Sequence, residues 1–401
     1  MTRFRTAFSR ALDPGVRVDE LLAGVGAGLP GGKPLSGGLI LATAACGHDC
    51  FEVARRLADR WPDTAVAGTS FEGVLAGGSI YRDEPAMVLL AWSEPSELAP
   101  NPFLLESGNV ESALLAEAIF EAAGRSRLES GDLVLLFADA HGSVAFEQTL
   151  AGLGPTIAPA CLAGAGSSGI DGREALTFVD GEVLPGAILG LFIPATVVEG
   201  AGAGNQAPLV CSAPATRKAS PWLEITKCRT RWIDELEGER TLDWVRRQLG
   251  LDDDSAIEPH LDRLLARVRR SGSPLQSGLD AWDEERYVVG LDANRGSFSW
   301  PGRFSVGDEL ALALPDRTRA REALSRSISE LRASPVLLQF ACRARDEALH
   351  GDSNLESAWA AHCAGDRDIV GTVAPFQFAM SSGLECRVLV HSTVLAALGG
   401  S

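Results

Sequence analysis

The fold class is decided by residues 38–68, which read GLILATAACGHDCFEVARRLADRWPDTAVAG. Residues 38–44 form a compact apolar segment of strand length. In residues 51–61 the apolar side chains recur at helical spacing and the charged side chains fall on the opposite side, which is typical of an amphipathic helix. Residues 65–68 begin a second strand. This order of strand, helix and strand predicts a layered α/β structure.

The same patterns extend outward from this stretch. In the first half we expect strands at 87–91, 133–137, 176–179 and 186–193, and helices at 112–123 and 144–153. A Gly-rich run at 199–205 indicates a boundary near 200–215. In the second half we expect strands at 222–227 and 335–342, and helices at 242–249, 259–270, 319–332 and 356–363. The predicted division is an N-terminal extension (1–35), a first domain (36–200), a linker (201–220) and a second domain (221–398), the two domains being related α/β units with mixed sheets.

Composition and charge exclude several classes of protein. With 401 residues, 46% of them hydrophobic, the chain is long enough for two globular domains. Its net charge of −17 repels phosphate backbones and anionic lipid, so we expect neither nucleic acid nor membrane as a partner. The Arg-rich start has no apolar segment followed by a cleavage site, and 8 cysteines without a C-x-x-C pair indicate reduced thiols. We therefore expect a cytoplasmic protein.

Three short motifs invite a chemical reading. The segment GVGAGLPGGK at 24–33 is similar to a phosphate loop, but Pro34 stands where Ser or Thr should bind magnesium, so a connector is the better interpretation. Cys46, His48 and Cys50 are spaced too tightly for a usual zinc site. Asp139 and His141 follow an apolar strand, at the end where ligand groups collect in open α/β sheets; the alternative is that Asp139 caps a helix and His141 is solvated.

Several glycine-centred segments, in a shared order, resemble the FIST family. In the first half these are VAGTSFEG at 66–73, LLFAD at 135–139, AGAGSS at 163–168 and FVDG at 178–181. In the second half they are ITKC at 225–228 with IDELEG at 233–238, FACRAR at 340–345 and HST at 391–393. There are departures: Ala344 replaces a family glycine, Glu72 a small polar residue, and Thr372 a glutamate that would pair with a ligand ammonium.

The resemblance implies a sensory protein with a FIST-N and a FIST-C domain that binds a small ligand, such as an amino acid, and signals through a separate protein. It places the ligand between the two domains. The site residues that we expect from the resemblance and from the strand-end position of Asp139 are Gly68, Ser70, Asp139, Gly166, Ser167, Arg345 and Thr372. In this hypothesis the glycine turns present N–H groups to an anionic ligand and Arg345 takes a carboxylate bidentately.

Three other interpretations stay open. The FIST family includes haem proteins that sense nitric oxide and regulate a partner kinase or cyclase, and His391 or His141 is then the candidate iron ligand. An adaptor whose inherited pocket is filled by side chains is the second. An enzyme using Cys342 as a nucleophile is the third, although nothing in the sequence pairs Cys342 with a base, and a buried packing role is simpler. We expect a protein that is not an enzyme.

Overall fold

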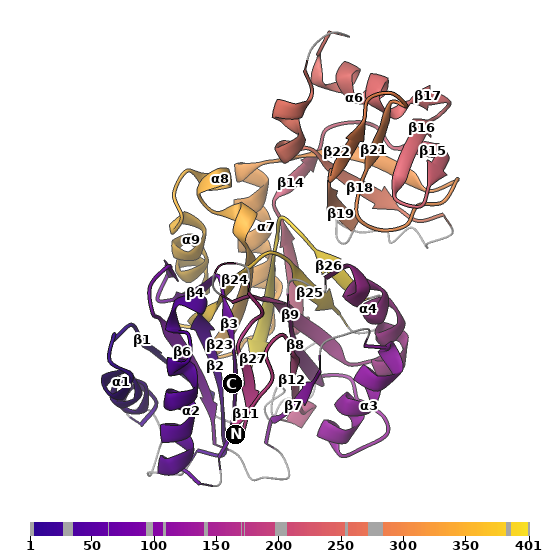
Figure 1. The fold of residues 1–401 in the computed structure, drawn as a ribbon. Coiled ribbons are helices and arrows are strands. Elements are labelled where there is room, and N and C mark those ends of the chain that lie inside the picture. Colours follow the sequence, from indigo (N-terminus) through magenta and orange to yellow (C-terminus); the bar gives the residue numbers. More distant parts are fainter. Residues whose placement is uncertain are drawn as a thin grey trace. The chain divides into compact units, whose positions relative to one another are not determined.

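The computed structural model describes residues 4–26, 35–62, 64–93, 99–106, 110–139, 143–169, 171, 173–196, 207–252, 256–271, 284–381 and 386–399. The chain divides into two compact units. The large unit comprises residues 1–213, 321–388 and 392–401, and the small unit comprises residues 214–320 and 389–391. The mixed α/β class predicted from the sequence is confirmed (Figure 1).

The large unit contains three six-stranded sheets, called here the first, second and third sheet. The first sheet has the order β1 (Arg5–Ser9), β6 (Met87–Trp92), β2 (Gly37–Thr43), β3 (Ala65–Phe71), β10 (Thr177–Val179), β11 (Glu182–Val183). The second has the order β7 (Asn101–Leu105), β12 (Ile188–Ile193), β8 (Leu133–Asp139), β9 (Cys161–Ser167), β25 (Gln377–Met380), β26 (Arg387–Leu389). The third has the order β13 (Val210–Pro214), β27 (Ser392–Leu398), β23 (Val336–Cys342), β24 (Asp368–Ala374), β4 (Gly73–Ala76), β5 (Ser79–Arg82).

All three sheets share one topology. The two central strands run parallel in each sheet, namely β2 with β3, β8 with β9 and β23 with β24. The strands on either side of each central pair are antiparallel to it. A parallel pair needs a crossover connection, which is helical here: α2 (Asp49–Arg60), α4 (Ser143–Ile157), and α8 (Glu347–His350) with α9 (Leu355–Ala364). The large unit is therefore built from three structural repeats, which the sequence patterns do not reveal.

The repeats exchange their hairpins in a cycle. Hairpin β4–β5 follows β3 of the first sheet but pairs with β24 of the third sheet. Hairpin β10–β11 follows β9 of the second sheet but pairs with β3 of the first, and hairpin β25–β26 follows β24 of the third but joins β9 of the second. Each sheet is thus completed by a neighbouring repeat, so the three repeats are interlocked.

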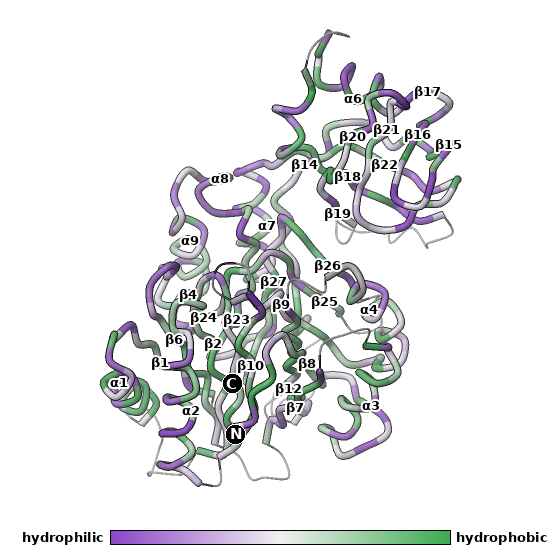
Figure 2. Tube along the Cα trace, in the orientation of Figure 1, coloured by the Kyte–Doolittle hydropathy of each residue, from purple (hydrophilic) through white to green (hydrophobic). Residues whose placement is uncertain are grey.

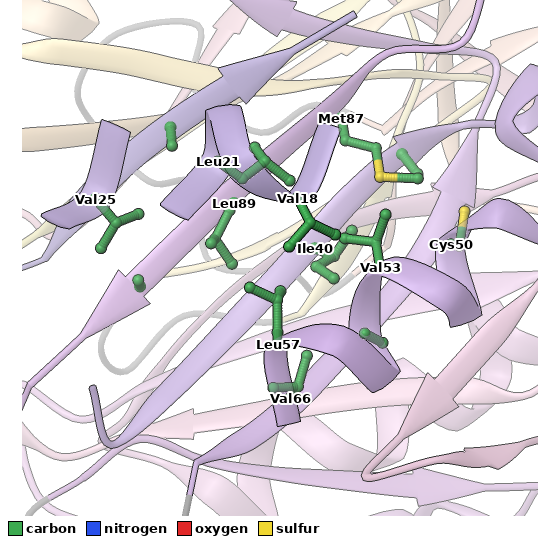
Figure 3. Close-up of a cluster of buried hydrophobic side chains, with 14 of the residues drawn as sticks. Val18, Leu21, Val25, Ile40, Cys50, Val53, Leu57, Val66, Met87 and Leu89 are labelled. Atoms are coloured by element: carbon green, nitrogen blue, oxygen red, sulfur yellow. The ribbon is translucent and has the colours of Figure 1, made fainter. Parts of the chain in front are cut away.

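Helices cover the outer faces of these sheets. Helices α1 (Pro14–Gly26) and α2 pack their apolar faces on the first sheet, where Val18 and Leu21 from α1 meet Val53 and Leu57 from α2 over Ile40 of β2 (Figure 3). Helix α3 (Ser112–Ala123), whose bounds the sequence predicts correctly, contacts α4 and β12. Helix α7 (Arg317–Glu330) contributes buried apolar residues to the core beneath the third sheet. The central strands are largely green in Figure 2, as expected for parallel strands buried on both faces.

A glycine occupies the same position in each parallel pair. The register places Gly68 beside Ile40, Gly164 beside Leu136 and Gly371 beside Gln339. A Cβ on Gly164 or Gly371 would lie 1.8 Å from the carbonyl oxygen of the paired residue, and a Cβ on Gly68 would lie 2.8 Å from that of Ile40. These glycines are therefore required for the strands to approach.

The small unit is a largely antiparallel sheet with one α-helix among its described residues. Its order is β19 (Glu284–Tyr287), β18 (Leu265–Arg269), β22 (Glu309–Pro315), β15 (Leu223–Arg229), β16 (Trp232–Leu236), β21 (Ser297–Ser299), β20 (Gly290–Asp292), with β14 (Thr216–Lys218) on β22 and β17 (Glu239–Arg240) on β16. Helix α6 (Thr241–Leu249) contributes Trp244 to a core that includes Phe298 and Trp300.

The helix predicted at 259–270 is wrong. Residues Glu258–Arg263 form a short 3-10 helix, and Leu265–Arg269 form strand β18 between β19 and β22. Arg267 lies inside this sheet, where its Nε donates to Glu285 at 3.0 Å. The apolar spacing of residues 265–269 therefore does not decide their structure. They form a strand because β19 and β22 supply their hydrogen bonds.

The predicted division into two consecutive domains differs from the observed units. Residues 321–388 and 392–401 belong to the large unit, because β23, β24 and β27 form the third sheet together with β4 and β5 from the first half. Strand β1 lies within the predicted extension but pairs with β6, and β13 and β14 lie within the predicted linker. Pairing between distant segments, which local patterns do not encode, accounts for the difference.

Candidate functional site

Strands β3, β9 and β24, one from each sheet of the large unit, contact one another pairwise. Their carboxyl ends are linked by the exchanged hairpins. Only Glu72 separates β3 from β4, and only Pro375 and Phe376 separate β24 from β25. Ser168, just after β9, donates its N–H to the carbonyl of Ser70 at 2.9 Å, so the ends of β9 and β3 are joined directly. The three carboxyl ends thus converge, as ligand sites of α/β sheets require.

Three phenylalanines show which faces of the sheets meet. The ring centroid of Phe137 lies 5.5 Å from that of Phe71 and 5.8 Å from that of Phe340, both edge to face. These residues come from the second, first and third sheet. The faces that carry them are called here the inner faces of the large unit.

Polar side chains occupy the inner faces beside these rings. Residues paired directly across two strands share a face, as do alternate residues of one strand. Six of the buried polar side chains on these faces are called here the inner polar set: Thr69 and Thr177 of the first sheet, Asp139, Ser167 and Gln377 of the second sheet, and Thr372 of the third sheet.

Part of the inner polar set is hydrogen-bonded within the protein. The hydroxyls of Thr69 and Thr177 lie 2.9 Å apart, and Asp139 accepts a bond of 2.7 Å from the N–H of Ala175. The amide nitrogen of Gln377 donates to the carbonyl of Ala374 at 3.2 Å. These contacts hold the side chains in fixed orientations.

Other atoms of the set have no such partner. Among the described residues nothing bonds the hydroxyls of Ser167 and Thr372 or the amide oxygen of Gln377. A buried polar atom left unsatisfied costs about 1–3 kcal/mol. Two hydroxyls and one amide oxygen on the inner faces of the second and third sheets are therefore available to bind a small polar molecule.

The predicted site residues fall into two groups. Asp139, Ser167 and Thr372 belong to the inner polar set. Gly68, Ser70 and Gly166 belong to the opposite faces of β3 and β9, because they alternate with Thr69 and Ser167. Their roles there are structural: a Cβ on Gly68 or Gly166 would collide with a phenylalanine ring, 2.5 Å from Phe178 or 2.7 Å from Phe376.

The hydroxyl of Ser70 makes two hydrogen bonds within the protein. It donates to the carbonyl of Ser168 at 2.8 Å and accepts from the N–H of Leu176 at 3.0 Å. Ser70 therefore holds the segment between β9 and β10 in place. The same segment contains Ala175, whose N–H donates to Asp139.

Arg345 does not have the exposure that a receptor for a ligand carboxylate needs. It is 0% exposed, and its Nε lies 2.8 and 3.0 Å from the two carboxylate oxygens of Glu356. A second nitrogen donates to the carbonyl of Ala213. The carboxylate that Arg345 binds is thus that of Glu356 and not that of a ligand. Through Glu356 and Ala213, Arg345 connects α9 to β13.

Glu356 is the centre of a buried polar cluster. His350 Nε2 lies 3.1 Å from its carboxylate, and the hydroxyl of Thr393 donates to it at 2.5 Å. Burial raises the pKa of Glu356, but the charge of Arg345 and the bonds from His350 and Thr393 outweigh this and hold the pKa below its usual value. The carboxylate is therefore ionised and paired.

The surroundings of His391 do not fit an axial haem ligand. His391 is 4% exposed, has a left-handed backbone (φ 50°), and its ring centroid lies 4.9 Å from that of Tyr287 in the small unit. An axial ligand has to face an apolar slot wide enough for the macrocycle, whereas Tyr287 covers this imidazole. His141, the other candidate, lies outside the described residues.

Cys46, His48 and Cys50 near the start of α2 differ in their surroundings. Cys46 and Cys50 are buried and hydrogen-bonded to each other, which lowers the pKa of Cys46 to about 7 despite its burial. The side chain of His48 is exposed and lies beside Phe51, 5.6 Å between ring centroids. Throughout the described part of the chain, no group of three His, Cys, Asp or Glu side chains is placed to hold a metal ion.

Thr69, Thr177 and Gln377 are not among the site residues expected from the sequence. Thr69 directly follows the strand glycine Gly68, as Thr372 follows Gly371, and this shared Gly-Thr pair is the one sequence signal that could have found it. Thr177 and Gln377 join the inner faces only through hairpin exchange, which no local pattern indicates.

Comparison with known proteins identifies the family of this chain. The model of the FIST N domain matches residues 38–239, about half of the chain. No curated protein matches the sequence. Among solved structures, cyanuric acid hydrolase from A. caulinodans aligns with 11% identity over 99% of this chain and 100% of that chain, but with a TM-score of 0.31, too low to support an argument. None of the described helices is long and apolar enough to cross a membrane. Half of the chain thus matches a sensory domain that binds small ligands in signal transduction, and the protein belongs to the FIST family.

Proposed function

We propose that this protein is a cytoplasmic small-molecule sensor that binds its ligand with the inner polar set of the large unit. The observation that carries the proposal is that three buried polar atoms without described partners, on Ser167, Thr372 and Gln377, lie on the inner faces of two sheets whose strands β9 and β24 are in contact. Buried polar atoms of folded proteins are nearly always satisfied, so a ligand that satisfies these three would bind with a gain in stability.

The charges of the set define the ligand class. Asp139 is its single ionisable member, and a carboxylate is the group of this set that can accept charge-assisted hydrogen bonds from a ligand ammonium. The hydroxyls of Ser167 and Thr372 are donors for a carboxylate or carbonyl at the other end of the molecule. The proposed ligand is therefore amino-acid-like, and the Thr at position 372 supplies a neutral contact where the family resemblance implies a glutamate.

Signal output goes to a separate protein in this proposal. Binding, not catalysis, is the proposed activity. Cys342, the one nucleophile considered from the sequence, is fully buried, with its thiol 3.8 Å from the carbonyl of Pro375, so a packing role suits it.

A thermal-shift screen of amino acids and small amines tests the proposal. A true ligand raises the Tm of the wild type in proportion to the logarithm of its concentration. The Ser167→Ala and Thr372→Val variants should lose most of that rise. Thr241→Val is the matched control, because Thr241 is a buried hydroxyl in the small unit that also has no described hydrogen-bond partner. A ligand whose effect survives both substitutions rejects this site, and the absence of any ligand favours the adaptor interpretation.

A further inference from the structure

A groove of about 810 Å³ opens beside α2, on the outer side of the first sheet. It is called here the α2 groove. Its apolar lining includes Phe51, Ala54 and Ala58 of α2, Val66 of β3 and Phe178 of β10. The α2 groove is therefore framed by a crossover helix and by the hairpin that the first sheet receives from the second repeat.

The equivalent place in the second sheet is filled. Phe146 of α4 meets Phe378 of β25 edge to face at 5.1 Å, just as Phe51 meets Phe178 at 5.5 Å in the first sheet. Beyond this pair, the sulfur of Met380 and the backbone of Cys386 lie 3.4 and 3.1 Å from where a Cβ on Gly154 of α4 would sit. Hairpin β25–β26 therefore packs directly against α4, and no groove separates them.

The equivalent place in the third sheet is closed in another way. Hairpin β4–β5 turns at Gly77 and Gly78, and α9 lies against this turn. A Cβ on Gly78 would be 3.2 Å from the Cβ of Ala361 and 3.4 Å from the Cα of Ala358. Helix and turn are in van der Waals contact, which leaves no groove between them.

The first sheet differs at the position of Met380. The register gives Asp180 the place that Met380 has in the second sheet, since Phe178 pairs with Gly68 as Phe378 pairs with Gly164. Asp180 turns toward β3: its Oδ1 accepts from the N–H of Val66 at 2.8 Å, and its own N–H donates to the carbonyl of Val66 at 2.9 Å. The hairpin is thus fixed against the strand, and the space beside α2 is left open.

The charges around the α2 groove are mainly negative. Glu52 and Asp59 both pair with Arg55, at 3.0 and 2.7 Å. Asp180 is exposed, and no ion pair joins it to another described residue. The α2 groove therefore offers an aromatic and aliphatic floor with one unneutralised carboxylate at its edge.

We propose that the α2 groove is a second ligand site, which binds a small organic cation with a flat apolar body, such as an arylalkylamine. The ring lies on Phe51 and Ala58, two partly exposed members of the apolar lining, and the ammonium group pairs with Asp180. The inference is independent of the proposed function, since no member of the inner polar set lines the α2 groove.

Titration calorimetry of the full chain with 2-phenylethylamine tests this site, with phenylacetate as a probe of similar shape and opposite charge. The amine should bind and phenylacetate should not. Asp180→Asn keeps the acceptor for Val66 and tolerates the left-handed backbone (φ 48°). It should weaken the amine about tenfold, which corresponds to ~1.4 kcal/mol.

Ala58→Phe should abolish amine binding by filling the α2 groove as Met380 fills its counterpart. Ala58 is partly exposed, so this change leaves the core intact, and an unchanged near-UV spectrum checks the fold of each variant. No binding of the amine to the wild type, or equal binding of both probes, overturns the proposal. Unchanged affinity in both variants overturns it as well, and loss of the amine in Thr372→Val instead would assign the probe to the inner polar set.

Discussion

Gly164 of β9 and Gly371 of β24 stand in two different sheets but meet the same obstacle, a carbonyl oxygen 1.8 Å from the position of a Cβ. Each lies in the parallel ladder of its sheet, so neither can move away without breaking backbone hydrogen bonds. The absence of a side chain at these two positions is what allows β9 to approach β8, and β24 to approach β23, this closely.

Gly371→Ala should therefore destabilise the large unit strongly. Overpacking costs about 1–3 kcal/mol where the structure can adjust, and here the obstacle is backbone, so we expect a loss of about 3 kcal/mol or more. Urea denaturation measures it. Gly26→Ala, at the end of α1 with nothing within 4 Å, is the matched control and should be neutral or slightly stabilising. Equal stabilities of the two variants would contradict the account.

Arg345→Ala should act on folding. Removing one partner of a buried ion pair costs about 3–5 kcal/mol, because Glu356 would be left buried and unpaired. Arg343→Ala is the control: Arg343 pairs with Glu72 at 2.8 Å but is 58% exposed, so its loss should cost about 0–1 kcal/mol. A stable Arg345→Ala protein that has lost only ligand affinity would restore the ligand-binding role that the sequence suggests.

The stability should also carry a pH dependence from Asp346. Burial raises the pKa of Asp346 to about 7, with Glu356 and Glu72 acting in the same direction and Arg82 and Arg345 opposing it. A carboxyl whose pKa is raised on folding favours the folded state at low pH, and this contribution disappears as the pH rises from about 4 through 7. The Asp346→Asn variant lacks this titrating carboxyl. Its free energy of unfolding relative to that of the wild type should therefore increase as the pH rises from 5 to 8, by an amount set by the number of pH units over which Asp346 titrates. Arg82 forms an ion pair with Asp346. A difference in stability that stays constant with pH would show that this ion pair keeps Asp346 ionised throughout.

Thr69 and Thr177 should be energetically coupled across β3 and β10. Their hydroxyls are buried and 2.9 Å apart, so a double-mutant cycle with Thr→Val at each position should give a coupling of about 1 kcal/mol. The measurement is chemical denaturation of the two single variants and the double variant. Additive effects would mean that the exchanged hairpin does not hold Thr177 against Thr69 in solution.

The sequence predicts the elements of the large unit well and their pairing poorly. The strand at 38–44 and the helix at 112–123 follow from apolar spacing alone, which is a local property. The hairpin exchange and the division of the chain depend on which edges meet, and that is decided by contacts between residues hundreds of positions apart, such as Val373 and Gly73.

The candidate site shows the same limit. Asp139 was selected because it ends an apolar strand, and Ser167 and Thr372 were selected from the family resemblance. Ser70 was selected from the same resemblance but lies on the opposite face of β3, since one position along a strand reverses the direction of a side chain. Arg345 was assigned to a ligand because the sequence cannot show that Glu356 reaches it from α9.

Methyl NMR of the threonines shows whether the ligand binds at the inner polar set. The ligand found by thermal shift is added to protein labelled at the threonine methyl groups, with assignment by single Thr→Val variants. We expect the signals of Thr69, Thr177 and Thr372 to shift, while that of Thr241 in the small unit does not. Shifts confined to Thr64, which lines the α2 groove, would place the ligand there; they would contradict binding by the inner polar set.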